Sequence, residues 1–117
     1  MCGIHGIYRF DGLSVEPGIL SAMGDRTRHR GPDDEGSHVD GLCGIAMRRL
    51  SIIYLAGGHQ PLSNADETLW LVCNGEIYNF RELRGELQAK GYHFKTGSDC
   101  EVLLHLYDAE GDDFIHR

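Results

Sequence analysis

The sequence contains no long apolar segment and has few basic residues. Nowhere does it approach the roughly 20 apolar residues of a membrane-spanning helix, and residues 2–8 are followed by polar residues, unlike a secretory signal. Eleven lysines and arginines stand against eighteen aspartates and glutamates, which gives a formal net charge of -7. The nearest approach to a basic cluster, at residues 26–30, is followed closely by acidic residues 33–35. We therefore expect no membrane and no nucleic acid among the partners, and a cytoplasmic location.

Closely spaced metal ligands are also missing. The four cysteines, Cys2, Cys43, Cys73 and Cys100, are far apart, and the seven histidines are scattered. Structural zinc sites are typically built from closely spaced ligand pairs. We therefore expect no metal site. In a reducing compartment, the alternative role for each cysteine is that of a small buried apolar residue.

The composition that remains is typical of one globular domain. Apolar residues make up 41% and charged residues 25% of the 117 positions. An alternating, β-rich stretch at residues 2–8 predicts a strand, and residues 14–28 have helical spacing that ends at Gly31-Pro32-Asp33. Further strands are predicted at the apolar runs 42–47, 50–55 and 68–73. The polar stretch at residues 56–67 predicts a long loop.

Two helices are predicted in the second half of the chain. Asn79 and Glu82 have the spacing of a capping box ahead of a helix that carries Leu83 and Leu87 on one face, and Gly91 is its expected stop. Strands come first and helices surround them, so the predicted class is α+β.

Ser98 and Glu101 repeat the capping spacing before the second of these helices. The apolar stripe of that helix consists of Val102, Leu103, Leu106 and Tyr107. The sequence stops at residues 114–117 without a terminating signal. We therefore expect residues 1–117 to form a single domain that is truncated at its C-terminal end.

Cys2 is the most unusual position. A small residue after the initiator permits removal of Met1, which leaves Cys2 with a free α-amine beside its thiol. Such an amine has a reference pKa of about 7.7–8.0, so it can accept a thiol proton near neutral pH. The resulting thiolate is a nucleophile that needs no catalytic histidine. The alternative is that the chain begins Met-Cys by chance.

Other residues have the chemistry to complete such a site. Asn74-Gly75 offers a side-chain amide beside a backbone N–H, and both can stabilise the oxyanion of a tetrahedral intermediate. An ordinary hairpin turn with positive φ is the alternative for this pair. Arg49 suits an α-carboxylate, and the carboxylates of Glu76 and Asp99 suit an α-ammonium. Solvated surface charge is the alternative for these three.

A series of motifs gives the chain a family resemblance. In order they are Cys2-Gly3-Ile4-x-Gly6, Arg28-His29-Arg30-Gly31-Pro32-Asp33, Arg49-Leu50-Ser51-Ile52-Ile53, Gln60-Pro61-Leu62, Asn74-Gly75-Glu76-Ile77-Tyr78-Asn79 and Gly97-Ser98-Asp99-Cys100-Glu101. Together they resemble the successive motifs of class II glutamine amidotransferases, in the version carried by asparagine synthetase and its relatives. The resemblance covers essentially the whole chain.

The resemblance implies a fold and a catalytic set. The fold is that of an N-terminal-nucleophile hydrolase, an αββα sandwich with two stacked sheets between helical layers. Cys2 would be the nucleophile and its α-amine the base. Asn74 and Gly75 would form the oxyanion hole.

The resemblance also implies a substrate, L-glutamine, and the residues that bind it. Its carboxylate would be held by Arg49 and by the backbone of Leu50, Ser51, Ile52 and Ile53. Its α-amino group would be received by Glu76 and Asp99, next to Asn74 and Gly75. Residues 28–33 would shape a turn near the site.

Three positions depart from the family pattern. Tyr54 stands where Asp is usual, Met47 stands where His is frequent, and His5 occupies a variable position. None is a proposed catalytic atom, so these departures bear on local packing and subfamily. Family glutaminase domains extend well beyond residue 117, so we expect the later strands of the fold to be absent.

The implied reaction is hydrolysis of glutamine to glutamate and ammonia through a thioester on Cys2. In the family, the ammonia passes to an ATP-dependent synthetase domain that amidates a carboxylate, usually that of aspartate. We expect that domain, with its ATP and Mg, to lie outside this chain, because no GxxxxGK[ST] loop is present. No cofactor is expected in the domain itself, and a homodimer is a candidate assembly.

Two other functions stay open. The first is an inactive amidotransferase-like module that binds glutamine or a partner chain without turnover. The second is a cysteine peptidase, which would need His29, His59 or His93 beside Cys2.

Overall fold

The computed structural model describes residues 2–50 and 58–117. In chain order the elements are β1 (Gly3–Tyr8), α1 (Pro17–Arg26), β2 (Asp34–Asp40), β3 (Cys43–Arg49), β4 (Leu62–Ser63), β5 (Trp70–Leu71), α2 (Phe80–Ala89), α3 (Glu101–Glu110) and the 3-10 helix η1 (Gly111–His116). The α+β class is therefore confirmed. The strand predicted at residues 50–55 lies, except for Leu50, outside the described residues.

β1, β3 and β2 form an antiparallel sheet in that order, with β3 in the centre. Gly3 of β1 and Glu35 of β2 both lie opposite Arg48 of β3. The β2–β3 hairpin turns at Gly41, whose φ of 53° favours glycine. Because β1 begins opposite the end of β3, the register brings Cys2 next to Leu50.

Strand β2 was not predicted from the sequence, because its mostly polar residues have no alternating apolar pattern. Pairing with β3 stabilises this strand from outside. Gly36 also permits a close approach, because a Cβ at this position would lie 1.9 Å from the backbone oxygen of Gln60. The segment is therefore a strand through its partners and not through its own propensity.

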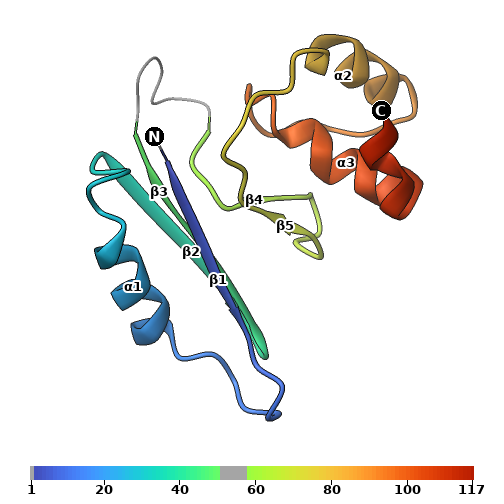
Figure 1. Cartoon of the computed structure of the whole chain (residues 1–117). Helices are drawn as coiled ribbons and strands as arrows, with labels where there is room; N and C mark the ends of the chain where they lie inside the picture. Colours follow the sequence, from blue (N-terminus) through green and yellow to red (C-terminus); the bar gives the residue numbers. More distant parts are fainter. Residues whose placement is uncertain (1, 51–57) are drawn as a thin grey trace.

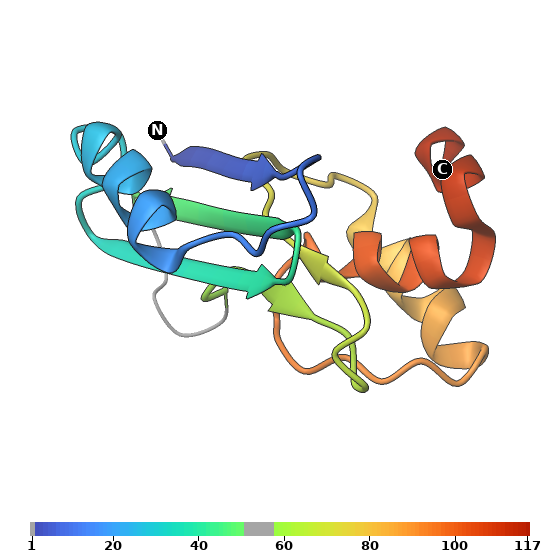
Figure 2. The same cartoon turned by 90° about the horizontal axis from the view of Figure 1, so that it is seen from below.

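α1 lies along one face of the three-stranded sheet (Figures 1 and 2). Pro17 takes the first helical position, where its missing N–H costs no hydrogen bond, and the helix is shorter at both ends than the expected 14–28. Leu20 and Gly24 are its buried residues. His5 of β1 donates from Nε2 to the Leu20 carbonyl oxygen at 3.2 Å, which ties the helix to the N-terminal strand.

A second, two-stranded sheet of β4 and β5 lies between the first sheet and helices α2 and α3 (Figure 1). The strand predicted at 68–73 is only Trp70–Leu71, and the loop predicted at 56–67 contains β4. Trp70 stacks on His38 of β2 with ring centroids 3.6 Å apart, which links the two sheets.

α2 and α3 pack through one apolar cluster, and the predicted faces are largely confirmed. Leu83 and Leu87 of α2 are buried with Val102 and Leu106 of α3. Tyr107 departs from the predicted stripe, because it is 43% exposed. No helix within the described ranges is long and apolar enough to cross a membrane.

Neither predicted capping box forms in full, although both helices begin close to where expected. The Ser98 hydroxyl oxygen accepts the Cys100 N–H at 3.3 Å, as a cap would, but the Ser98 N–H donates to Thr96 Oγ1 and not to Glu101. Asn79 makes no cap hydrogen bond and donates instead to the backbone oxygen of Arg117 at 3.2 Å. Glu101 turns its carboxylate toward the backbone N–H groups of Lys95 and Thr96, at 2.6 and 2.8 Å. The stop at Gly91 is confirmed: its φ is 98°, and Tyr92 N donates to Leu87 O at 3.0 Å.

Candidate active site

Cys2 is half-buried directly before β1 and contacts two distant segments. The Leu50 N–H points at the Cys2 sulfur, with 3.5 Å between nitrogen and Sγ. The Asn74 side chain donates from Nδ2 to the Cys2 carbonyl oxygen at 3.1 Å. A thiol, a backbone donor and a side-chain amide are therefore gathered around residue 2.

Asn74 and Gly75 are exposed and lead from β5 into the approach to α2. They form no hairpin turn, and neither residue has positive φ, so the alternative suggested by their sequence is wrong. The Gly75 carbonyl oxygen accepts the Cys100 thiol at 3.7 Å. The segment is thus fixed on one side by residue 2 and on the other by the start of α3.

Arg49 lies on the opposite face of β3 from Arg48, because neighbouring strand residues alternate. Its Nη1 donates to the Gly58 carbonyl oxygen at 2.6 Å, whereas Arg48 pairs with Glu35 at 2.6 Å. The Asp33 N–H donates to the Arg49 carbonyl oxygen at 3.1 Å. The turn at residues 28–33 therefore holds the backbone of this arginine.

Glu76 precedes Ile77 in the chain, whereas Asp99 reaches Ile77 through a hydrogen bond. Asp99 accepts the Ile77 N–H at 2.7 Å, so its carboxylate fixes the loop that carries Glu76. Glu76 is exposed, and within residues 2–50 and 58–117 no hydrogen bond or ion pair holds its carboxylate. The two acids thus border the same loop.

The thiols of Cys73 and Cys100 contact each other beside Gly75. Burial, and then the neighbouring Cys73 thiol and the Asp99 carboxylate, raise the pKa of the Cys100 thiol. Cys100 is consequently held as a neutral thiol, which is a poor nucleophile. Cys2 is the better candidate.

Comparison with known proteins decides the family. The glutamine amidotransferase domain matches residues 1–117. This chain belongs to that family. It is 44% identical over 118 residues to asparagine synthetase (glutamine-hydrolyzing) 2 of Bacillus subtilis (strain 168), a match that covers 98% of this chain and 16% of that protein.

Two further relatives agree. Asparagine synthetase (glutamine-hydrolyzing) 1 of the same organism is 48% identical over 110 residues, covering 92% of this chain and 17% of the relative. A probable asparagine synthetase of Dictyostelium discoideum is 47% identical over 119 residues, covering 99% of this chain and 21% of the relative. The amidotransferase domain described here thus spans about a fifth of the length of these curated relatives.

The structure of the amidotransferase domain brings together only part of the predicted site. Cys2, Leu50 and Asn74 are joined by hydrogen bonds, and Asp99 braces the loop after Gly75. Ser51, Ile52 and Ile53 lie outside the described residues.

The peptidase hypothesis gains no support from the geometry. His59 pairs through Nδ1 with the Asp34 carboxylate at 2.8 Å, and His29 and His93 are exposed. Among the described residues, Cys2 makes its hydrogen bonds with Leu50 and Asn74 and not with a histidine. In the part of the chain that is described, no group of three or more His, Cys, Asp or Glu residues is placed to hold a metal ion.

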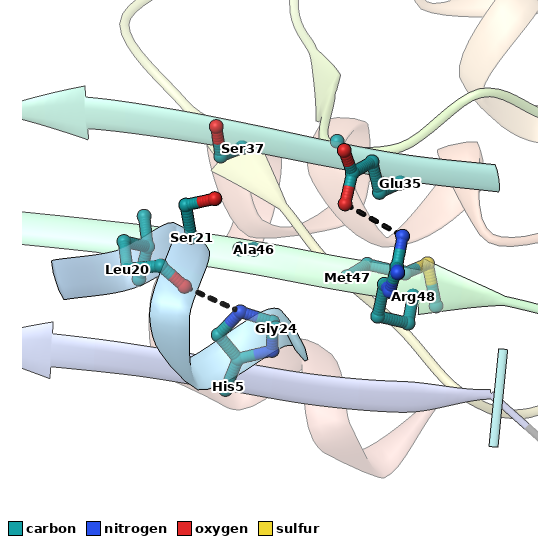
Figure 3. Close-up of a pocket in the computed structure, with 10 residues that line it drawn as sticks. His5, Leu20, Ser21, Gly24, Glu35, Ser37, Ala46, Met47 and Arg48 are labelled. Atoms are coloured by element: carbon teal, nitrogen blue, oxygen red, sulfur yellow. Dashed lines mark hydrogen bonds and ion pairs between the residues drawn. The ribbon is translucent and has the colours of Figure 1, made fainter. Parts of the chain in front are cut away.

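A separate cavity of about 260 Å³ lies between α1 and the sheet, on the side of Arg48 (Figure 3). It contains two buried polar atoms with no partner among the described residues, His5 Nδ1 and Arg48 Nε. Ser21 and Ser37 also line it, so it is polar and large enough for water. This cavity belongs to the packing of α1 and not to the candidate active site.

The structure shows a role for Gln60 that could not be predicted from the sequence. The sequence placed it in a family motif without a role, yet its side chain binds both backbone groups of Cys73, directly before Asn74. The only signal in the sequence is the motif itself, because a contact across 13 residues leaves no periodic pattern.

Proposed function

We propose that this domain hydrolyses L-glutamine to glutamate and ammonia, as the glutaminase part of an asparagine synthetase-like enzyme. The observation that carries the proposal is the meeting of three distant segments at residue 2. The Asn74 amide lies 3.1 Å from the Cys2 carbonyl oxygen, and the Leu50 N–H lies 3.5 Å from the Cys2 sulfur. Family membership supports glutamine as the ligand.

The proposed chemistry is acyl transfer. After removal of Met1, the α-amine of Cys2 takes the thiol proton, and the thiolate attacks the side-chain amide carbon of glutamine. The oxyanion that forms is stabilised by the Asn74 side-chain amide and the Gly75 N–H. The ammonium of Cys2 then protonates the departing nitrogen, and ammonia leaves. Water attacks the γ-glutamyl thioester, which releases glutamate and restores the thiol.

The two charged ends of glutamine are assigned to side chains of opposite charge around Cys2. Arg49, together with the backbone at residues 50–53, binds the α-carboxylate, since a guanidinium can donate two parallel hydrogen bonds. Glu76 and Asp99 receive the α-ammonium. Support comes from Asp99, whose contact with Ile77 N places it at the border of the loop that carries Glu76.

The rest of the enzyme is proposed from the family. For the complete domain we propose the αββα fold of N-terminal-nucleophile hydrolases, supported by the antiparallel sheet, with β1 at its edge and α1 on one face. A synthetase domain of the same polypeptide would bind ATP and Mg and use the ammonia to amidate aspartate. We assign the protein to amino-acid biosynthesis in the cytoplasm, with a homodimer as a candidate assembly.

Intact-mass measurement tests the nucleophile. The full-length protein is treated with a glutamine-like diazoketone, with and without excess glutamine. We expect loss of Met1 and one adduct on Cys2 that glutamine suppresses. Cys2→Ala should remove both the adduct and glutamine hydrolysis while preserving ammonia-dependent synthesis. A retained Met1, or an adduct that glutamine does not block, contradicts the proposal.

An inactive glutamine-binding module is the second candidate. It is favoured by one observation: one of the two N–H bonds of the Asn74 amide already points at the Cys2 carbonyl oxygen, so only the other is free for an oxyanion. Calorimetric binding of glutamine without glutamate release by the full-length protein would establish it. Release by the full-length protein but not by residues 1–117 would instead show that the shorter chain lacks part of the fold.

A further inference from the structure

The side chain of Gln60 replaces a missing strand neighbour for Cys73. Cys73 follows β5 and has left the ladder, so its backbone polar groups need partners elsewhere. The Cys73 N–H donates to Gln60 Oε1 at 2.7 Å, and Gln60 Nε2 donates to the Cys73 carbonyl oxygen at 3.2 Å. One primary amide therefore satisfies both the donor and the acceptor of a single residue.

Gln60 is itself well fixed. It is only 8% exposed, and its own carbonyl oxygen lies against Gly36 of β2, where a Cβ would come within 1.9 Å. Buried amides are held in one orientation when both ends are paired, as they are here. The pair of hydrogen bonds thus connects the main sheet to the backbone of Cys73.

The neighbours of Gln60 reach other parts of the site. Gly58 accepts the Arg49 guanidinium at 2.6 Å, and His59 pairs with Asp34 at 2.8 Å. On the far side, Cys73 precedes Asn74, whose amide reaches Cys2. Residues 58–60 therefore touch both the proposed carboxylate-binding arginine and the segment of the proposed oxyanion donors.

We propose that Gln60 is a positioning residue for the oxyanion hole: by holding both backbone groups of Cys73, it sets the place of the Asn74 amide and the Gly75 N–H relative to Cys2. The inference rests on the proposed glutaminase function. Gln60 itself touches no reacting atom, and it acts through the backbone of the next segment.

The test compares Gln60→Met with Gln88→Met in the full-length protein. Methionine keeps the length of the side chain and removes both hydrogen bonds. Gln88, the other glutamine of the chain, is exposed on α2, so it controls for the chemical change.

For Gln60→Met we expect a kcat for glutamine hydrolysis lowered about 10- to 100-fold. KM should stay within about threefold, because the residues assigned to the carboxylate and ammonium are untouched. Gln88→Met should match the wild type in both constants.

A second measurement is independent of turnover. In NMR spectra, Gln60→Met should speed hydrogen exchange at the Cys73 amide and shift the resonances of the Asn74 side-chain amide and the Gly75 N–H. Unchanged Asn74 and Gly75 resonances, or a rise in KM as large as the fall in kcat, would overturn the inference. A wild type that releases no glutamate would instead overturn the proposed function, and the resonances would still decide the role of Gln60.

Discussion

Gly31 lies against the backbone of Arg48 with no room for a side chain. A Cβ at Gly31 would be 2.3 Å from the Arg48 carbonyl carbon and 2.5 Å from the Arg49 nitrogen. The turn at residues 28–33 and strand β3 are thus in direct backbone contact, next to the arginine proposed to bind the substrate carboxylate. This agrees with the structural role that the family resemblance implied for the turn.

Gly31→Ala should therefore destabilise the domain and disturb Arg49. Overpacking of this kind typically costs about 1–3 kcal/mol, and a displaced Arg49 should also raise KM for glutamine. Urea unfolding and steady-state kinetics measure the two effects.

Gly85→Ala is the control, because a Cβ there meets nothing within 4 Å on helix α2. That change should stabilise by about 0.5–1 kcal/mol. Equal effects of the two substitutions would show that the contact at Gly31 carries no strain.

Arg49→Lys should raise KM for glutamine at least tenfold. A lysine ammonium cannot bind the Gly58 carbonyl oxygen and also present a two-pronged donor to a carboxylate. Arg48→Lys is the matched control, because Arg48 is the adjacent residue on the other face of β3 and pairs with Glu35. Its KM should stay near that of the wild type. If both substitutions change KM alike, the assignment of Arg49 to the substrate is wrong.

Asp99→Asn should weaken glutamine binding more than it slows the chemical step. The asparagine carbonyl can still accept the Ile77 N–H, so the loop is kept while the negative charge proposed to face the substrate ammonium is lost. Kinetics at saturating and limiting glutamine separate the two effects. Asp112→Asn, an exposed acid of η1, should have no effect. A collapsed kcat at constant KM would contradict the proposed role.

Glu101→Gln should lower stability at neutral pH. Burial alone would raise the pKa of this carboxyl, but hydrogen bonds from Thr96 and from the Lys95 N–H outweigh burial and lower it from its ordinary 4.5. Loss of charge-assisted hydrogen bonds of this kind costs about 1.5–3 kcal/mol.

The pH dependence of that effect follows from the lowered pKa. A carboxyl with a lower pKa in the folded state stabilises the protein above its unfolded pKa, and the contribution is lost as pH falls through the folded value. The difference between wild type and Glu101→Gln should therefore shrink below about pH 4.5. Glu82→Gln, at the matching first turn of α2 but exposed, should show little difference at any pH. A difference that grows in acid would mean that the ionised carboxylate is not the stabilising form.

The elements with regular patterns could be predicted from the sequence. Alternation located β1, and the spacing of Leu83 and Leu87 located the buried face of α2. β2 could not be predicted, because its stability comes from β3 and from the approach of Gln60 to Gly36.

Hydrogen bonds to groups outside the helices explain why the capping boxes are incomplete, and a contact between separate segments explains the missed role of Gln60. The Asn79 amide binds Arg117, 38 residues away, in preference to its own helix. The Glu101 carboxylate accepts hydrogen bonds from the backbone N–H groups of Lys95 and Thr96. Of the candidate site, the residue types and motifs could be predicted, whereas the hydrogen bonds that place them are made between segments whose proximity only the fold determines.

Strand β1 is synthesised before its partner β3, so during translation it remains unpaired for a time. Leu50, which contacts the Cys2 sulfur, follows it by 48 residues, and ribosomes add roughly 5–20 residues per second, so the partner of the N-terminal strand is made roughly 2 to 10 s later. During that interval the terminus is unpaired and open to an aminopeptidase. The free α-amine that the proposed mechanism requires can thus be made on the nascent chain, before β1 has its partner strand.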